Sequence, residues 1–121
     1  MEQLEELEHT FVELYQSALL LQQGGKQKAA VILFSKALFA LIDYIIFEKY
    51  QKLPKNHGER FRILELKFPS LYEIVNSVWG KYTDTYHKPA LEESVSLLKQ
   101  SIKEVVNNAK ITRREIKIII E

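Results

Sequence analysis

The sequence predicts an all-α fold, an antiparallel helical bundle of about five helices, and two observations support this. Only 4 Gly and 3 Pro occur among 121 residues, so few turns interrupt the chain. Hydrophobic residues make up 46% of the chain and recur at the three- and four-residue steps of amphipathic helices. A chain of this length is expected to form a single domain, residues 1–121.

The first two predicted helices supply most of the hydrophobic core. Apolar residues from Leu4 to Leu21 step 3-4-3-4-3, which predicts an amphipathic helix that ends at Gly24-Gly25. Residues 26–50 are apolar nearly all round, as is typical of a central helix with neighbours on several sides. Lys36 and Asp43 share one face of this helix, which favours burial in a bundle over a membrane span. No signal sequence is evident, so we expect a cytoplasmic protein.

Capping signals predict two helices in the middle of the chain. Asn56 followed by Glu59 forms a capping box for a short helix over residues 57–67. Pro69 is expected to stop that helix, and Ser70 is expected to cap the next one. Aromatic residues recur seven apart along this fourth helix: Tyr72, Trp79 and Tyr86.

The last long helix carries the most regular apolar stripe. Pro89 suits its first position, and apolar residues from Leu91 to Ala109 step 4-3-4-3-4. The tail, residues 111–121, is rich in isoleucine. Because β-branched residues favour strands, we expect a strand or an extended arm, with a continued helix as the alternative.

Several classes of chemistry are excluded or unsupported by composition and spacing. The chain has no Cys, which removes disulfides, thiolate zinc sites and cysteine nucleophiles. His9, His57 and His87 lie too far apart for a helical metal-ligand pair. Gly24-Gly25-Lys26 lacks the second half of a phosphate-binding loop. We therefore predict no metal site and no cofactor.

The net charge of +1 hides an uneven distribution. Residues 1–25 carry five Glu and no Lys or Arg, so the remaining residues, with 17 basic and 11 acidic groups, have a net charge of +6. Part of this excess lies in residues 49–67, where six basic and two acidic residues give +4. Affinity for nucleic acid as a polyanion grows with the number of phosphates neutralised. The pattern therefore favours one confined anionic ligand, or an acidic protein partner, over non-specific coating of nucleic acid.

Two polar segments contain the candidate site residues. KLPKNHGERFR, residues 52–62, places His57 and Arg60 within one turn at a helix N-terminus, where they could clamp a phosphate. KYTDTYHKP, residues 81–89, gathers basic and aromatic groups at a helix end. A solvated basic loop and half-buried tyrosines are the alternatives without function. The predicted ligand- or phosphate-binding residues are His57, Arg60, Lys55, Tyr82, Tyr86 and Lys88.

These two segments, placed between long apolar helices, resemble a HEPN domain (higher eukaryotes and prokaryotes nucleotide-binding) over about residues 5–110. The resemblance implies a helical bundle that pairs as a homodimer. Many HEPN domains are metal-independent ribonucleases with an Arg and a His that are separated by four to six residues. His87 stands at the position of that His, and Lys81 replaces the Arg. Lysine offers a point charge without the two-pronged donor set of arginine.

Three functional hypotheses follow. The first, which we favour, is a dimeric module that binds a nucleotide or nucleic-acid phosphate, or partners a minimal nucleotidyltransferase in a toxin–antitoxin-type pair. The second is a metal-independent RNA endonuclease that uses His87 as acid and base and Lys81 to stabilise charge. The third is a purely structural or interaction domain, assembled through its acidic first helix and isoleucine tail.

Overall fold

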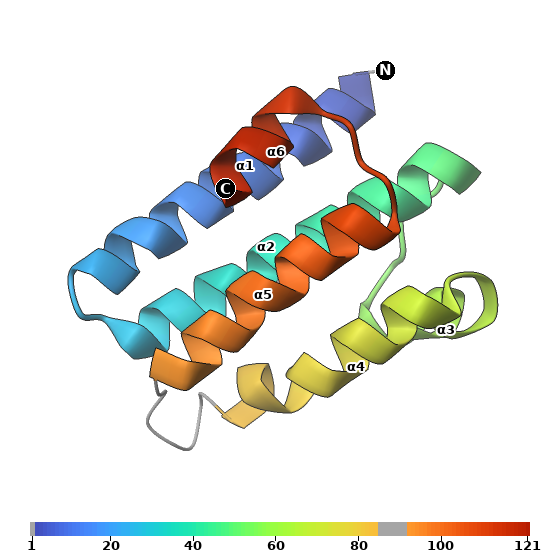
Figure 1. The fold of residues 1–121 in the computed structure, drawn as a ribbon. Helices are drawn as coiled ribbons and strands as arrows, with labels where there is room; N and C mark the ends of the chain where they lie inside the picture. The colour runs from blue at the N-terminus through green and yellow to red at the C-terminus, as the bar shows by residue number, and fades with distance from the viewer. Residues whose placement is uncertain (1, 85–91) are drawn as a thin grey trace.

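In the computed structural model, residues 2–84 and 92–121 are described, and all their regular secondary structure is helical. The consecutive long helices alternate in direction (Figure 1), so the predicted antiparallel all-α bundle is confirmed. The expected start of the last long helix at Pro89 lies outside the described residues. The helices are α1 (Glu2–Gln23), α2 (Gln27–Tyr50), α3 (His57–Lys67), α4 (Pro69–Asp84), α5 (Glu92–Asn108) and α6 (Arg114–Ile120).

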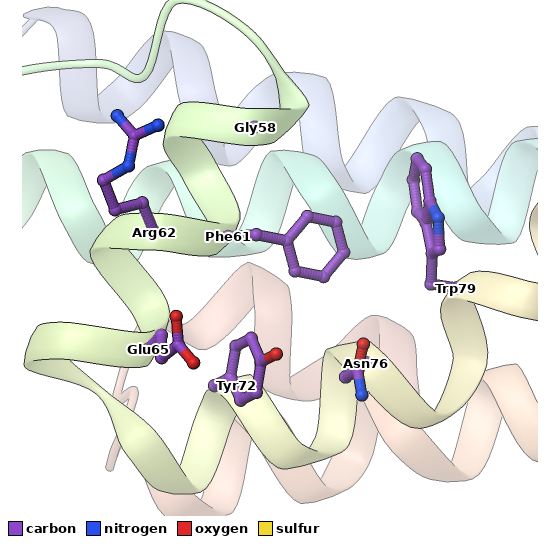
Figure 2. Close-up of a pocket in the computed structure, with 7 residues that line it drawn as sticks. All are labelled: Gly58, Phe61, Arg62, Glu65, Tyr72, Asn76 and Trp79. Carbon is purple, nitrogen blue, oxygen red and sulfur yellow. The ribbon is translucent and has the colours of Figure 1, made fainter.

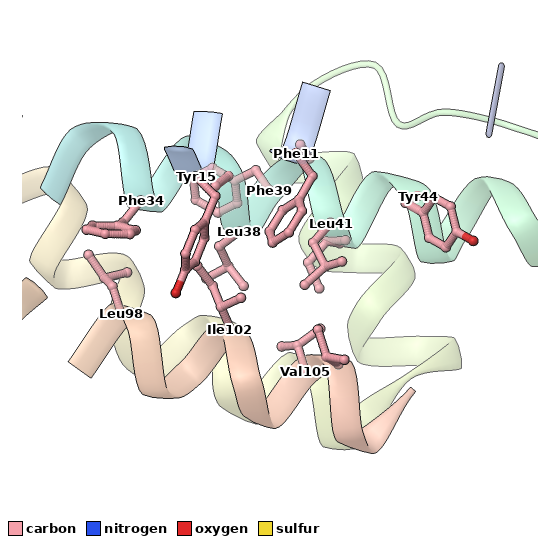
Figure 3. Packing of buried hydrophobic residues seen from close by; sticks show 14 of the residues in the cluster. Phe11, Tyr15, Phe34, Leu38, Phe39, Leu41, Tyr44, Leu98, Ile102 and Val105 are labelled. Atoms are coloured by element: carbon pink, nitrogen blue, oxygen red, sulfur yellow. The ribbon is translucent and has the colours of Figure 1, made fainter. Parts of the chain in front are cut away.

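Helix α2 is the centre of the core, as its nearly uniform apolar character predicts. Thirteen of its residues are buried, and α1, α4 and α5 all pack against it. Figure 3 shows side chains from α1, α2 and α5 meeting in one cluster. The Tyr15 ring of α1 meets Phe34 of α2 edge-on, with ring centroids 5.2 Å apart, while Leu98 and Ile102 of α5 are fully buried in the same cluster.

By length and composition, α2 is the one described helix that could cross a membrane. In its most apolar stretch, 72% of the residues are buried by the rest of the fold. Its apolar surface is thus largely accounted for by contacts with the other helices.

The turn between α1 and α2 follows the glycine signal. Gly25 has a φ of +76°, in the left-handed region that favours glycine. The Lys26 amide donates to the Leu21 carbonyl at 2.9 Å, and the Gly25 amide donates to Gln22 at 3.0 Å. These bonds satisfy the last carbonyls of α1 in the manner of a Schellman motif. The predicted end of the first helix is confirmed.

The boundaries around α3 confirm one capping prediction and correct another. The Asn56 side chain accepts the Glu59 amide at 2.9 Å, and the Glu59 carboxylate accepts the Lys55 amide at 3.1 Å. Helix α3 therefore begins at the predicted residue. Pro69 is the first residue of α4, where its fixed φ suits a helix start. The expectation that Ser70 caps this helix is wrong, because Ser70 lies inside it.

The tail differs from the strand or extended arm that we expected, because residues 114–120 form helix α6. Ile116 and Ile120 lie one turn apart and are both buried where α6 packs on α1 and α5. Burial of these two side chains outweighs the modest helix propensity of isoleucine. Just before α6, the Arg113 Nε donates to the Tyr44 hydroxyl at 2.9 Å, and Arg113 lies 3.6 Å from the Glu8 carboxylate.

Candidate functional site

The predicted phosphate ligand Arg60 is already engaged by a carboxylate within the fold. Its Nε donates to Asp43 Oδ1 at 2.8 Å and its Nη2 donates to Asp43 Oδ2 at 3.0 Å. The side chains of Arg60 and Asp43 are only 11% and 19% exposed. The guanidinium carbon also lies 5.3 Å from the centre of the Phe39 ring. This two-pronged pair joins α3 to α2 and neutralises the Arg60 charge.

His57 lies beside this ion pair in an aromatic environment. The Arg60 Nη1 is 2.6 Å from His57 Nδ1, and because a guanidinium only donates, Nδ1 accepts. The His57 ring centroid is 4.8 Å from that of Phe39 and 4.9 Å from that of Trp79. Burial lowers the pKa of His57 below its ordinary value. The charges of Arg60 and Lys36 lower it further, against the opposing influence of Asp43. The fold therefore favours a neutral His57.

This arrangement predicts a pH-dependent stability. Because the pKa of His57 is lowered in the fold, the unfolded chain takes up its proton first as the pH falls below about 6.5. The free energy of unfolding should therefore decrease from pH 7 to pH 5.5. Urea unfolding at the two pH values measures this, and the His57→Gln variant should lose less stability. The control is His9→Gln at an exposed position of α1. An equal loss in wild type and His57→Gln would contradict the assignment.

The structure brings some predicted site residues together. Tyr82 of α4 joins the two candidate segments, because its ring centroid is 5.6 Å from Phe39 and 6.4 Å from His57. Lys55 is exposed in the loop before α3.

The other predicted site residues have no described geometry. Lys81 falls on α4, but its side chain is not described, and Tyr86, His87 and Lys88 lie outside the described residues. The ribonuclease hypothesis therefore stays a prediction.

A pocket of about 370 Å³ lies between α3 and α4, which we call the α3–α4 pocket. Figure 2 shows Phe61 projecting from α3 toward Trp79 of α4, while the Arg62 side chain extends from α3 in another direction. The residues that line it are Gly58, Phe61, Arg62, Glu65, Tyr72, Asn76 and Trp79.

Three aromatic rings form one wall of the α3–α4 pocket. The Phe61 ring meets Trp79 edge-on at 5.2 Å between centroids and Tyr72 edge-on at 6.3 Å. All three residues are only partly buried, and all three line the pocket. Such a wall suits a flat aromatic ligand, which stacks on exposed ring faces.

The polar side of the α3–α4 pocket carries one cation, Arg62, and one carboxylate, Glu65. Arg62 is exposed, and no carboxylate among the described residues forms an ion pair with it. Gly58 is the second residue of α3, and within residues 2–84 and 92–121 its amide N–H has no acceptor. Free amides in the first turn of a helix and a guanidinium both attract anions. Asn76 adds one amide.

The start of α3 was predicted as part of a site, but most of the residues that line this pocket were not. Their spacing along α3 and α4 was the available sequence signal. Phe61 and Glu65 lie four apart on α3, while Tyr72, Asn76 and Trp79 lie four and three apart on α4, so each set shares a helix face. Which two faces meet depends on how α3 packs on α4, and the helical period does not contain that information.

Comparison of the chain with protein-family models, with curated proteins and with solved structures gives no match. The resemblance to HEPN domains therefore remains an expectation from the two segments that carry it.

Among the side chains of residues 2–84 and 92–121 that the structure describes, no group of three His, Asp or Glu is arranged to hold a metal ion.

Proposed function

We propose that this protein is a nucleotide-binding module and that the α3–α4 pocket receives the nucleotide. The observation that carries the proposal is the combination, in one pocket, of an aromatic wall with an arginine that has no ion-pair partner among the residues the structure describes. The base would stack on the ring face of Trp79, and the Phe61 ring, at 79° to Trp79, would meet the base edge-on. Asn76 would hydrogen-bond to the edge of the base. Stacking is tolerant of base identity, so it supports the class of ligand more than one particular base.

The phosphate group would lie at the start of α3. Arg62 supplies a charged, two-pronged donor, and the Gly58 amide supplies a backbone donor near the positive end of the helix dipole. This differs from the clamp of His57 and Arg60 that we expected, since Arg60 already binds Asp43 and His57 accepts from Arg60. In this proposal, those two residues hold α3 in place beneath the pocket.

The chain contains a single tryptophan, Trp79, so its fluorescence reports on the α3–α4 pocket directly. Adenosine monophosphate should change this fluorescence in a saturable way at low salt. Replacing Arg62 with glutamine should weaken binding of the monophosphate by about tenfold or more, because a charge-assisted hydrogen bond contributes about 1.5–3 kcal/mol. Adenosine, which has no phosphate, should bind the variant and the wild type equally.

The matched control is Arg114→Gln, which removes the same charge from an exposed position on α6. It should leave the affinity for the monophosphate unchanged. Ribose 5-phosphate, which lacks the base, should bind far more weakly than the monophosphate. Equal affinity for the two would show that stacking contributes nothing, and equal weakening by both arginine variants would show that only net charge matters. Either result would refute the proposed site.

A homodimer and a small nucleotidyltransferase as protein partner belong to the same proposal. Both are implied by the resemblance to HEPN domains. A nucleotidyltransferase partner would also bind nucleotides, as we propose for the α3–α4 pocket. Sedimentation of the purified chain, alone and with a candidate nucleotidyltransferase, tests these two points separately from nucleotide binding.

A further inference from the structure

A second hollow, about 410 Å³ in volume, lies between the C-terminal part of α2 and α3, and we call it the α2–α3 groove. Its lining residues are Ile46, Tyr50, Lys52, Ile63 and Lys67. At 100° per residue, its α3 members lie on nearly the opposite side of the helix from Phe61 and Glu65. The groove is therefore separate from the α3–α4 pocket.

The floor of the α2–α3 groove is apolar and partly open to solvent. Ile46 and Ile63 supply branched aliphatic surface, and Tyr50 adds a ring that remains 38% exposed. Leu53, in the loop that follows α2, is also 41% exposed. Apolar surface left in contact with water favours the binding of an apolar group.

Lysines surround this apolar floor. Lys52 and Lys67 line the groove, and the Lys49 ammonium lies 5.9 Å from the Tyr50 ring centre and 5.7 Å from that of Phe68. Across the described parts of the chain, no carboxylate forms an ion pair with any of these three lysines. An anionic group placed here would therefore meet uncompensated positive charge without displacing an internal partner.

We propose that the α2–α3 groove binds a small amphiphilic carboxylate, with its aliphatic tail on Ile46, Tyr50 and Ile63 and its carboxylate beside Lys52 and Lys67. The volume lies in the range of small-molecule sites. A nucleobase fits the groove poorly, because the Tyr50 hydroxyl is the one uncharged side-chain polar group among the lining residues. An aliphatic tail needs no such partners, and the lysines complement a carboxylate head.

Calorimetric titration with octanoate, kept in its monomeric range, tests this proposal. Octanoate should bind, whereas acetate, which lacks the tail, and octanol, which lacks the charge, should each bind at least tenfold more weakly. Hexanoate should bind more weakly than octanoate, by up to about fourfold for each methylene lost. Octanol binding as tightly as octanoate, or no octanoate binding, would overturn the proposal.

Variants locate the binding in the groove. The double variant Lys52→Gln with Lys67→Gln should weaken octanoate binding at least tenfold. The matched control, Lys26→Gln with Lys28→Gln, removes two exposed charges at the far end of α2 and should leave octanoate binding unchanged. Equal weakening by both double variants would overturn the proposal. Light scattering tests a second copy of the chain as occupant: self-association that the Lys52 and Lys67 substitutions abolish, without octanoate binding, would also overturn it.

Discussion

Replacing Asp43 with alanine is expected to lower the free energy of unfolding by about 3 kcal/mol, and the melting temperature by roughly 10 °C. The reason is the burial of its partner. Arg60 donates to Asp43 through Nε and Nη2, and the Arg60 side chain is 11% exposed. Without the carboxylate, the guanidinium stays in a largely desolvated position with no opposite charge. Chemical denaturation of the variant measures the loss.

A double variant separates the attraction of the pair from the penalty of an unpaired charge. Asp43→Leu with Arg60→Met removes both charges and should recover most of the lost stability, because apolar groups of similar size often replace a buried pair at little cost. Glu48→Ala, at an exposed position of the same helix, should change stability by less than about 0.5 kcal/mol. A double variant as unstable as Asp43→Ala would contradict this account.

Replacing Phe34 with alanine is expected to cost about 3–5 kcal/mol of unfolding free energy, the range for truncating a buried aromatic ring. Phe34 is completely buried on α2 and meets the Tyr15 ring edge-on at 5.2 Å. The substitution removes apolar contacts and leaves a cavity between α1, α2 and α5 (Figure 3). Thermal or chemical denaturation followed by circular dichroism measures the effect.

The matched control is Leu20→Ala on α1, where the side chain is 69% exposed. The Leu20→Ala variant should lose less than about 0.5 kcal/mol of unfolding free energy, since Leu20 buries little surface in the fold. If Phe34→Ala costs no more than Leu20→Ala, the central position of α2 in the core is wrong.

The helices could be predicted from the sequence wherever local signals specify them. The start of α3 follows from Asn56 and Glu59, whose side chains make capping bonds within a few residues. The end of α1 follows from Gly25, because a left-handed φ is a local requirement. The central place of α2 follows from its apolar character on all sides. In each case the sequence signal lies within one element or its nearest turn.

The tail was predicted wrongly because its structure depends on distant contacts. Alternating isoleucines fit a strand, but Ile116 and Ile120 also fit one face of a short helix. The contact of α6 with α1 and α5 decides between these patterns. Pro69 shows a related ambiguity, since a proline that ends one helix also suits the first position of the next.

The candidate site was predicted only in part. His57 and Arg60 do lie together, as their spacing of three indicates, and Tyr82 joins them. The pairing of Arg60 with Asp43 spans 17 residues, so no local pattern shows it. A carboxylate on a nearly all-apolar helix does require a cation, and that requirement was the available clue. It indicates that a partner exists without identifying which of the 17 basic residues supplies it.

Helix α6, which packs on α1 and α5, is the last helix of the fold to be synthesised. Helices α1 and α2 are neighbours in sequence, so the ribosome releases both early and they can pair as a local hairpin. The surface that Ile116 and Ile120 later cover stays open until α6 has been made. The nascent chain thus carries an uncovered apolar strip during that interval, which is when it is most prone to aggregate or to need a chaperone.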